Sequence, residues 1–264
     1  VTAGTGQPVV AAPGRALADR VVVVTGASRG VGRDLARVFA DHGARLGLLA
    51  RSRDALDDLG GTLTAAGADV LAVPCDVGEP DSLAGAVDAV AGHFGGIDSV
   101  VVNAGISPVA RRAHHLPIDA WHDVLATNLT GGFVTARAAY PHLARSGRGR
   151  LVFTTSVMAA TPRRGLSAYA ASKAGLEGLT RALAADWAGD GILVNAVAPG
   201  FFDTGLGAAF HTSQRLHEQV VGRTPVARFG RADELAAAFV FLAGDACGYL
   251  TGQVLAVDGG YGLG

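Results

Sequence analysis

Tyr169 and Lys173, four residues apart, are the side chains in this sequence best suited to acid–base chemistry. An apolar run with helical spacing follows them, and side chains four positions apart in a helix lie on one face. A lysine ammonium beside a phenol favours the phenolate and lowers the tyrosine pKa from its usual value of about 10. The pair therefore predicts a tyrosine that exchanges a proton with a substrate near neutral pH.

Two further polar residues could complete such a site. Ser156 follows the apolar run 151–153, at the expected carboxyl end of a strand, where open α/β sheets bind their ligands. Asn128 lies within a long helical segment upstream. Each has a structural alternative, because Ser156 could cap a turn and Asn128 could bond a neighbouring carbonyl in a kinked helix. The Tyr-x-x-x-Lys spacing is also weak by itself, since helices often carry such a pair on a solvated face.

A glycine-rich turn follows residues 21–24, whose continuous β-branched side chains are typical of a strand buried on both faces. The turn reads Thr25-Gly26-Ala27-Ser28-Arg29-Gly30-Val31-Gly32 and leads into an amphipathic segment. Glycines let the backbone approach a pyrophosphate, and the start of a helix offers N–H groups with a partial positive charge. The spacing differs from the dinucleotide fingerprint Gly-x-Gly-x-x-Gly. We expect a phosphate-bearing cofactor here, with an ordinary helix start as the alternative.

Strand-like and helical segments alternate along the chain. Further strands are expected at residues 45–50, 69–74, 97–102, 150–154, 192–197 and 254–257. Helices are expected at residues 53–66, 79–94, 119–145, 169–188 and 233–243, the third of them softened by Gly131 and Gly132. Such alternation predicts a parallel sheet with right-handed crossovers and helices on both faces. No linker or repeat divides the segments, so one α/β domain is expected.

Two segments fall outside this alternation. Residues 1–19 show no periodicity and are expected to form a flexible N-terminal extension. The connection 201–230 is long for a compact domain, which predicts a functional segment. We expect a substrate lid around residues 201–225, with a short helix at 214–221.

Composition excludes several classes of protein. With 264 residues, of which 49% are hydrophobic and 17% charged, the chain is neither disordered nor a coiled coil. A net charge of −1 gives no electrostatic footprint for nucleic acid or an anionic membrane, and the apolar runs are too short to span a bilayer. Cys75 and Cys247 share no motif spacing, which indicates reduced thiols rather than a disulfide or a metal site. No secretory signal is visible, so a cytoplasmic protein is expected.

Together these landmarks resemble the short-chain dehydrogenase/reductase family over residues 20–261. The resemblance is carried by Thr25-Gly26-x-x-x-Gly30-x-Gly32, Asp76, Asn103-Ala104-Gly105, Asn128, Ser156, Tyr169-x-x-x-Lys173, and Pro199-Gly200 with Thr204. It implies a single Rossmann-type catalytic domain over residues 20–264, a doubly wound parallel sheet of about seven strands with helices on both faces. It also implies a nicotinamide cofactor, hydride transfer to or from a carbonyl or alcohol carbon, and a homotetramer.

The resemblance also implies a role for each residue. Tyr169 would donate a proton in reduction and accept one in oxidation, while Lys173 would lower its pKa and hold the nicotinamide ribose. Ser156 would hydrogen-bond the substrate oxygen, where negative charge grows during reduction, and Asn128 would hold a water that passes protons to Lys173. Asp76 would contact the adenine, unless it only caps the following helix. The expected cofactor contacts are Gly26, Ser28, Arg29, Gly30, Val31, Gly32, Arg51, Ser52, Asp76, Val77, Asn103, Ala104, Gly105, Tyr169, Lys173, Pro199, Gly200 and Thr204.

The residues after the second strand bear on the choice of cofactor. An acidic residue there would bind the ribose 2′-hydroxyl of NAD, whereas an arginine accommodates the 2′-phosphate of NADP. Here Ala50 takes the place of the acid, Arg51 follows it, and Arg29 in the glycine turn adds a second positive charge. Asp54 is the competing candidate, but it is expected in the first turn of a helix. The sequence therefore predicts NADP(H) rather than NAD(H).

Three functions stay open on the sequence. The first is an NADPH-dependent carbonyl reductase or alcohol dehydrogenase, resembling the 3-oxoacyl-thioester reductases of the family and acting on a free or carrier-bound ketone. The second is a sugar or polyol dehydrogenase of the gluconate or glucose type, which Arg223-Thr224-Pro225 also resembles. The third is a non-catalytic NADP-binding sensor, against which the retained Tyr169 and Lys173 argue.

Basic residues gather around the expected mouth of the site. Arg111, Arg112, His114 and His115 follow the fourth strand, and Arg163 and Arg164 precede Tyr169. A solvated loop is the favoured interpretation, and recognition of an anionic substrate or carrier group is the alternative. The two histidines lack the spacing and partners of a metal site, so no metal is expected.

Overall fold

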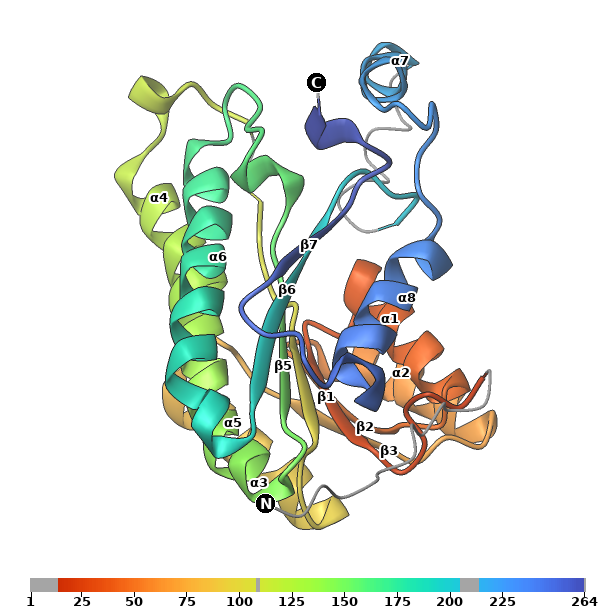
Figure 1. Ribbon diagram of the computed structural model, residues 1–264. Coiled ribbons are helices and arrows are strands. Elements are labelled where there is room, and N and C mark those ends of the chain that lie inside the picture. Colours follow the sequence, from red (N-terminus) through yellow and green to blue (C-terminus); the bar gives the residue numbers. More distant parts are fainter. Residues whose placement is uncertain (1–13, 108–109, 205–213, 264) are drawn as a thin grey trace, which may run out of the picture.

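The strands form one parallel sheet, in the order β3-β2-β1-β4-β5-β6-β7 (Figure 1). They are β1 (Val21–Thr25), β2 (Arg45–Ala50), β3 (Val70–Pro74), β4 (Ser99–Val102), β5 (Arg150–Thr154), β6 (Leu193–Pro199) and β7 (Val254–Val257). This computed structural model describes residues 14–107, 110–204 and 214–263. The order of the strands reverses between β1 and β4, the kind of switch point at which open α/β sheets bind ligands. The predicted doubly wound, Rossmann-type fold is confirmed.

Helices cover both faces of the sheet (Figure 1). One face carries α3 (Pro80–Phe94), α5 (Gly131–Ser146) and α6 (Ser167–Trp187), and the other carries α1 (Gly30–Asp41), α2 (Arg53–Ala65) and α8 (Ala232–Ala243). Val22 and Val24 pack into the core below α1, α2 and α8, whereas Val21 and Val23 pack into the opposite core. Successive side chains of a strand point to opposite faces, so a sheet covered on both sides requires continuous apolar strands.

The long helix expected at residues 119–145 has a break in its middle. It consists of α4 (Ile118–Leu125), a π-helical turn η2 (Ala126–Thr130) and α5. Gly131 and Gly132 do not soften it, and both are buried within helical backbone. A Cβ on Gly132 would lie 2.9 Å from Cδ2 of Leu176, so this glycine permits close packing of α5 on α6. The π turn places Asn128, only 1% exposed, toward the site described below.

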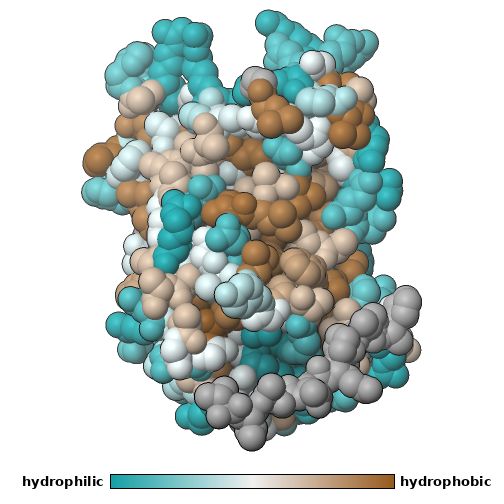
Figure 2. Space-filling model, in the orientation of Figure 1, coloured by the Kyte–Doolittle hydropathy of each residue, from teal (hydrophilic) through white to brown (hydrophobic). Residues whose placement is uncertain are grey.

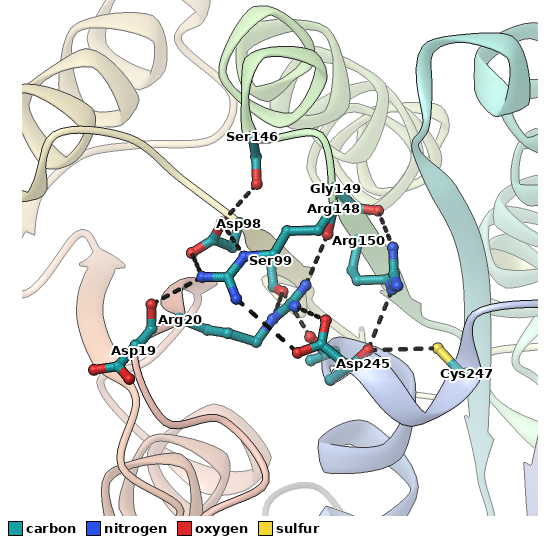
Figure 3. Close-up of polar contacts among 12 residues, drawn as sticks. Asp19, Arg20, Asp98, Ser99, Ser146, Arg148, Gly149, Arg150, Asp245 and Cys247 are labelled. Carbon is teal, nitrogen blue, oxygen red and sulfur yellow. Dashed lines mark hydrogen bonds and ion pairs between the residues drawn. The ribbon is translucent and has the colours of Figure 1, made fainter. Parts of the chain in front are cut away.

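Charged side chains hold the amino ends of the strands together (Figure 3). Arg20, immediately before β1, is fully buried, pairs with Asp245 and donates to the carbonyl of Arg148 at 2.7 Å. Asp98, immediately before β4, accepts hydrogen bonds from the Val21 N–H at 2.9 Å and from Nε of Arg148 at 3.0 Å. The starts of β1, β4 and β5 are thereby fixed to one another and to the end of α8.

The packed domain begins before residue 20. Leu17 is fully buried in the core with α1 and α8, and its N–H donates to the His42 carbonyl at 3.1 Å. Residues 1–13 of the expected extension lie outside the described residues, as do residues 205–213 of the expected lid. The helix expected at 214–221 is α7 (Gln214–Arg223). Within the described ranges, no helix is long and apolar enough to cross a membrane.

Candidate active site

A cleft of about 970 Å³ opens at the carboxyl ends of β1, β4, β5 and β6. It brings together nearly all the residues that the sequence marks for the site. The lining includes Gly26, Ser28, Arg29, Gly30, Val31, Arg51, Ser52, Asp76, Val77, Asn103, Ala104, Gly105, Ser156, Tyr169, Lys173, Pro199, Gly200 and Thr204. Gly32 and Asn128 lie immediately behind this lining.

The glycine turn between β1 and α1 has the shape of a phosphate cradle. Gly26 and Gly30 have φ values of 68° and 54°, which glycine adopts without strain. A Cβ on Gly32 would lie 2.3 Å from the Gly26 carbonyl oxygen, so only glycine fits there. Arg29, the residue before α1, makes no side-chain cap, which leaves the first N–H groups of this helix without that partner. These features fit the pyrophosphate of a dinucleotide.

Thr25 connects the glycine turn with the loop after β4. Its Oγ1 accepts hydrogen bonds from the N–H groups of Asn103 at 3.0 Å and Ala104 at 3.1 Å. The Asn103 side chain returns a bond to the Thr25 carbonyl at 3.1 Å. Sequence reasoning used Thr25 only as part of a motif and missed this role, since it depends on the pairing of β1 with β4. Thr25 therefore fixes two walls of the cleft relative to each other.

Lys173 is buried without a counter-charge. Its side chain is 4% exposed, and Nζ donates a hydrogen bond of 2.7 Å to the Thr154 carbonyl at the end of β5. Burial lowers the Lys173 pKa from 10.5 to about 8. Among the described residues no ion pair to Lys173 occurs. The Thr154 hydroxyl is also buried and has no hydrogen-bond partner in the part of the chain that the structure describes.

Tyr169 lies beside Lys173, with Nζ 5.7 Å from the centroid of the phenol ring. Burial raises the Tyr169 pKa, and a hydrogen bond from Ser156 acts in the opposite direction without outweighing it. The sequence predicted the reverse, a pKa lowered by the ammonium. That prediction left out desolvation, which disfavours both the phenolate and the charged lysine. The buried phenol is consequently suited to holding a proton for donation.

Ser156 caps a turn, the structural alternative considered from the sequence, and its contact with the substrate oxygen stays a prediction. Its Oγ accepts a hydrogen bond from the Met158 N–H at 3.1 Å and caps the short 3₁₀ turn η3 (Val157–Ala159). The same hydroxyl lies near the Tyr169 phenol and acts to lower its pKa. With 8% of the residue exposed, Ser156 is held rigidly at the wall of the cleft.

The side chain of the buried Asn128 connects three segments around the site by hydrogen bonds. Its Oδ1 accepts from the Ile106 N–H at 2.8 Å, and its Nδ2 donates to the Ile106 carbonyl at 2.9 Å and to Ser172 Oγ at 3.0 Å. Ser172 in turn donates to the Tyr169 carbonyl at 2.7 Å. The chain thus links the loop after β4, the π turn and the first turns of α6. The predicted water relay to Lys173 stays a prediction, and Ser172 is a residue that sequence reasoning missed.

At the far end of the cleft, the arginines expected to select the cofactor are exposed. Arg51 is 69% exposed and lies 3.8 Å from Asp76, while Ala50 ends β2. Ser52 caps α2 by accepting from the Ala55 N–H at 3.4 Å. Asp54 lies in the first turn of α2, as predicted. No carboxylate therefore occupies the position after β2 that would bind a ribose hydroxyl.

Asp76 and Thr204 make local contacts within this lining. Asp76 Oδ1 accepts from the Gly78 N–H at 2.9 Å, which closes the turn before α3. The Thr204 hydroxyl donates to the carboxylate of Asp34 on α1, so it joins the segment after β6 to the glycine-turn helix. Both side chains remain at the cleft wall.

The basic loops come together at the mouth. The Arg111 N–H donates to the Gly165 carbonyl at 3.1 Å, which ties the loop after β4 to the loop before α6. Arg111, Arg112, His114 and His115 are exposed. Among the described residues no group of His, Cys, Asp and Glu could hold a metal, and the thiols of Cys75 and Cys247 are buried and free.

Comparison with known proteins places the chain among related enzymes. A family model described as enoyl-(acyl carrier protein) reductase matches residues 26–262. The chain is 40% identical over 248 residues to the cis-4-hydroxycyclohexanecarboxylate dehydrogenase of Sinomonas cyclohexanicum, covering 94% of this chain and 98% of that one. It is 36% identical to a 3-oxoacyl-[acyl-carrier-protein] reductase of Staphylococcus aureus, covering 90% of this chain and 96% of the relative.

Among solved structures, a gluconate 5-dehydrogenase from Burkholderia cenocepacia, in complex with NADP and tartrate, matches with a TM-score of 0.90. It is 34% identical, and the match covers 95% of this chain and 98% of the other. Sequence and fold similarity thus extend over nearly the whole chain.

Proposed function

Because the chain belongs to the short-chain dehydrogenase/reductase family, whose members are oxidoreductases acting on alcohol and ketone carbons, we propose that it is an NADPH-dependent carbonyl reductase. The observation that carries the proposal is the Ser156–Tyr169–Lys173 arrangement at the carboxyl end of β5, opposite the glycine turn. The same site would run in reverse as an alcohol dehydrogenase. Residues 20–264, together with the buried Leu17 before them, would form the catalytic domain, with a lid around 201–225 that includes α7.

The residues of the chain supply the proton chemistry. A nicotinamide cofactor, when bound, supplies or accepts the hydride. Tyr169 Oη donates its proton to the substrate oxygen, and the Ser156 hydroxyl hydrogen-bonds the same oxygen as negative charge develops on it. Burial keeps the phenol protonated until then, and the Lys173 ammonium stabilises the phenolate that remains. Asn128 and Ser172 hold the start of α6, and with it Tyr169, in place.

Arg51 and Arg29 support the choice of NADP(H). Both are exposed at the cleft wall, and within the described residues the ion pair of Arg51 is a long one, to Asp76 at 3.8 Å. Arg51→Ala should lower kcat/KM for NADPH by about tenfold to a hundredfold, because a hydrogen bond to a charged group contributes about 1.5–3 kcal/mol. The value for NADH should stay the same. Arg53→Ala, an exposed neighbour in α2, is the control, and equal losses with both cofactors would contradict the assignment.

A hydroxy-acid or sugar-acid dehydrogenase is the second candidate. Two of the similar proteins are named for such substrates, cis-4-hydroxycyclohexanecarboxylate and gluconate, and a third for a 3-oxoacyl carrier protein. NADPH absorbance with 4-oxocyclohexanecarboxylate, 5-ketogluconate and 3-oxoacyl thioesters distinguishes these classes. Tight NADPH binding without turnover of any carbonyl or alcohol would favour a sensor instead.

Assembly into a homotetramer is part of the proposal. Apolar side chains stay exposed on the edge strand β7 and on α8, where Leu255 is 39% and Phe241 42% exposed, and on α5, where Phe133 is 43% exposed. Figure 2 shows apolar residues gathered over the middle of the face that carries β7. Sedimentation equilibrium would test this. The two buried free thiols are compatible with a reducing, cytoplasmic location.

A further inference from the structure

The hydroxyl of Thr154, the last residue of β5, is buried without a hydrogen-bond partner. The residue is 7% exposed, and its Oγ1 makes no hydrogen bond within the part of the chain that the structure describes. Its backbone carbonyl, by contrast, accepts a bond of 2.7 Å from Nζ of Lys173. Burying a hydroxyl without a hydrogen bond destabilises a folded protein, so an unpaired group of this kind beside an active site is a candidate for binding a ligand.

The carbonyl opposite Thr154 is already used by the next threonine in the chain. Val197 lies opposite Thr154 on the adjoining strand β6. Its carbonyl accepts from the N–H of Thr155 at 2.8 Å and from Oγ1 of Thr155 at 3.0 Å, which uses both lone pairs of the oxygen. Two successive threonines therefore differ, because the hydroxyl of Thr155 is satisfied within the protein and that of Thr154 is not.

Thr154 lies in the cleft on the side of the glycine turn. Val152, two residues before it, packs into the core below α1, and side chains two positions apart in a strand share a face. Thr154 therefore faces the side of the sheet that carries α1, and it is part of the cleft lining. Rotation about the Cα–Cβ bond exchanges the hydroxyl and methyl groups of a threonine between staggered positions. The hydroxyl can thus reach the cleft without movement of β5.

Lys173 and Thr154 approach the same end of the cleft from opposite faces of the sheet. Lys173 comes from α6, whose Leu176 packs into the other core. Ser156, two residues beyond Thr154, and Tyr169 mark this end of the cleft as the place of the proposed hydride transfer. The nicotinamide ring must lie here, with its ribose expected at Lys173. The one polar substituent of the ring is its carboxamide, which needs hydrogen-bond partners of its own.

We propose that the Thr154 hydroxyl binds the carboxamide of the nicotinamide ring and thereby gains the hydrogen bond that the protein alone does not provide. A carboxamide has N–H donors and a carbonyl acceptor, and a hydroxyl can pair with either. The contact orients the ring at the end of β5, beside Ser156 and Tyr169, where hydride transfer requires it. This inference rests on the proposed function, because it requires a nicotinamide cofactor.

Cofactor binding measured without turnover tests the proposal. Calorimetric titration compares NADP⁺, its analogue with a methyl group in place of the carboxamide, and 2′-phospho-ADP-ribose, which lacks the ring; if the wild type prefers NAD⁺, the same ligands are used without the 2′-phosphate. Thr154→Val should weaken binding of the complete cofactor about fivefold to tenfold, the effect of one neutral hydrogen bond, and leave the other two affinities within about twofold. Thr154→Ser should retain the preference for the carboxamide. Thr155→Val is the matched control and should change each affinity by no more than about twofold.

Urea unfolding of the cofactor-free protein gives an independent readout. The midpoint for Thr154→Val should be at or above that of the wild type, because valine fills the same space without an unpaired hydroxyl, whereas Thr155→Val should lower it. Equal lowering of the midpoint by both substitutions, equal losses of affinity for all three ligands, or cofactor binding unaffected by Thr154→Val would each overturn the inference while leaving carbonyl reduction intact. Failure of the wild type to bind either NADP⁺ or NAD⁺ would instead overturn the proposed function.

Discussion

At the amino ends of β1 and β4, the buried Arg20 and the half-buried Asp98 lie against opposite charges, whereas at the carboxyl end of β5, Lys173 is buried against a neutral carbonyl. Figure 3 shows how the side chains of the first region point toward one another across three strand starts. Both regions belong to the same sheet, one at the amino ends of its strands and the other at the carboxyl ends. The contrast therefore comes from the groups that contact each charged side chain and not from the sheet itself.

The pKa values reflect this difference. Burial acts to raise the Asp98 pKa, but hydrogen bonds from Ser146, Arg148 and the Val21 N–H outweigh it and hold the pKa below 3.8. At the carboxyl ends of the strands burial is not outweighed, so the Lys173 pKa falls to about 8 and that of Tyr169 rises despite the opposing effect of Ser156. The contacts at the amino ends of the strands stabilise the charged forms of their side chains. At the carboxyl ends, by contrast, Lys173 keeps a pKa close to neutral pH, at a cost in stability.

Lys173→Met should have the largest effect, because it removes the buried charge at the carboxyl end of β5. Turnover should fall by at least about a thousandfold, because general acid–base catalysis contributes about 10²–10⁴ and the phenolate loses its stabilising charge. The cofactor-free protein should nevertheless gain about 2 kcal/mol of stability. A pKa shift from 10.5 to about 8 corresponds to about 1.4 kcal/mol per unit, less about 1 kcal/mol for the lost bond to Thr154. Urea unfolding and NADPH-coupled rates measure the two effects.

That gain in stability should depend on pH. Between the folded pKa of about 8 and the unfolded value of 10.5, the unfolded chain binds more protons, so wild-type stability rises with pH across this window. At pH values below this window, the buried Lys173 ammonium destabilises the folded state to its full extent. The advantage of the methionine variant should therefore be largest near neutral pH and disappear as the pH approaches 10.5. An advantage that did not vary with pH would rule out desolvation of Lys173 as its cause.

Asp98→Asn tests the amino ends of the strands, where the change in stability should have the opposite sign. The variant should lose about 2–3 kcal/mol of stability, because Arg148 loses the nearer of its two carboxylate partners in a site where the Asp98 side chain is only 13% exposed. Since the folded Asp98 pKa is lowered, the stabilisation is fully present above the unfolded value of about 3.9 and is lost as the pH falls.

The difference in the free energy of unfolding between wild type and Asp98→Asn should accordingly decrease at low pH. Urea unfolding at several pH values measures it. Asp57→Asn, on the exposed face of α2, is the matched control and should have little effect. A difference that persists unchanged at low pH would show that charge pairing is not what stabilises this edge.

Ser172→Ala should give the smallest effect. It tests whether one hydroxyl in α6 contributes both to stability and to the positioning of Tyr169. Ser172 is fully buried and bonds both Asn128 and the Tyr169 carbonyl. Its loss should cost about 1 kcal/mol of stability and lower kcat by about fivefold, since α6 would hold Tyr169 less firmly.

Thr180→Val provides the control in the same helix. Its buried hydroxyl donates to the Leu176 carbonyl at 2.7 Å, far from the site, so stability should fall similarly while kcat stays unchanged. Equal effects of the two substitutions on kcat would remove Ser172 from the positioning of the site.

The sequence predicted most of the fold, because the signals for these elements are local. The β-branched run before Gly26 and the alternation of strands and helices suffice to predict a parallel sheet with helices on both faces. The Tyr169–Lys173 spacing predicts that the two side chains share one helical face. Each of these features depends on residues near one another in the chain, or on rules that hold for parallel sheets in general.

Features that depend on distant partners could not be predicted in this way. The π turn at Asn128 follows from bonds to Ile106 and Ser172, 22 and 44 residues away. The direction of the Tyr169 pKa shift depends on how deeply α6 packs, which a spacing rule does not contain. The bond from Thr204 to Asp34, 170 residues apart, likewise has no sequence signal.

Tyr169→Phe isolates the role of Tyr169 as proton donor, because it removes only the phenolic oxygen from the ring. NADPH binding to wild type and variant is measured by fluorescence titration, alongside turnover of a ketone that the wild type reduces. The variant should bind NADPH with an affinity within about twofold of wild type, and its kcat should be reduced by at least about a thousandfold. Near-normal turnover in the variant would contradict the assignment of Tyr169 as the proton donor.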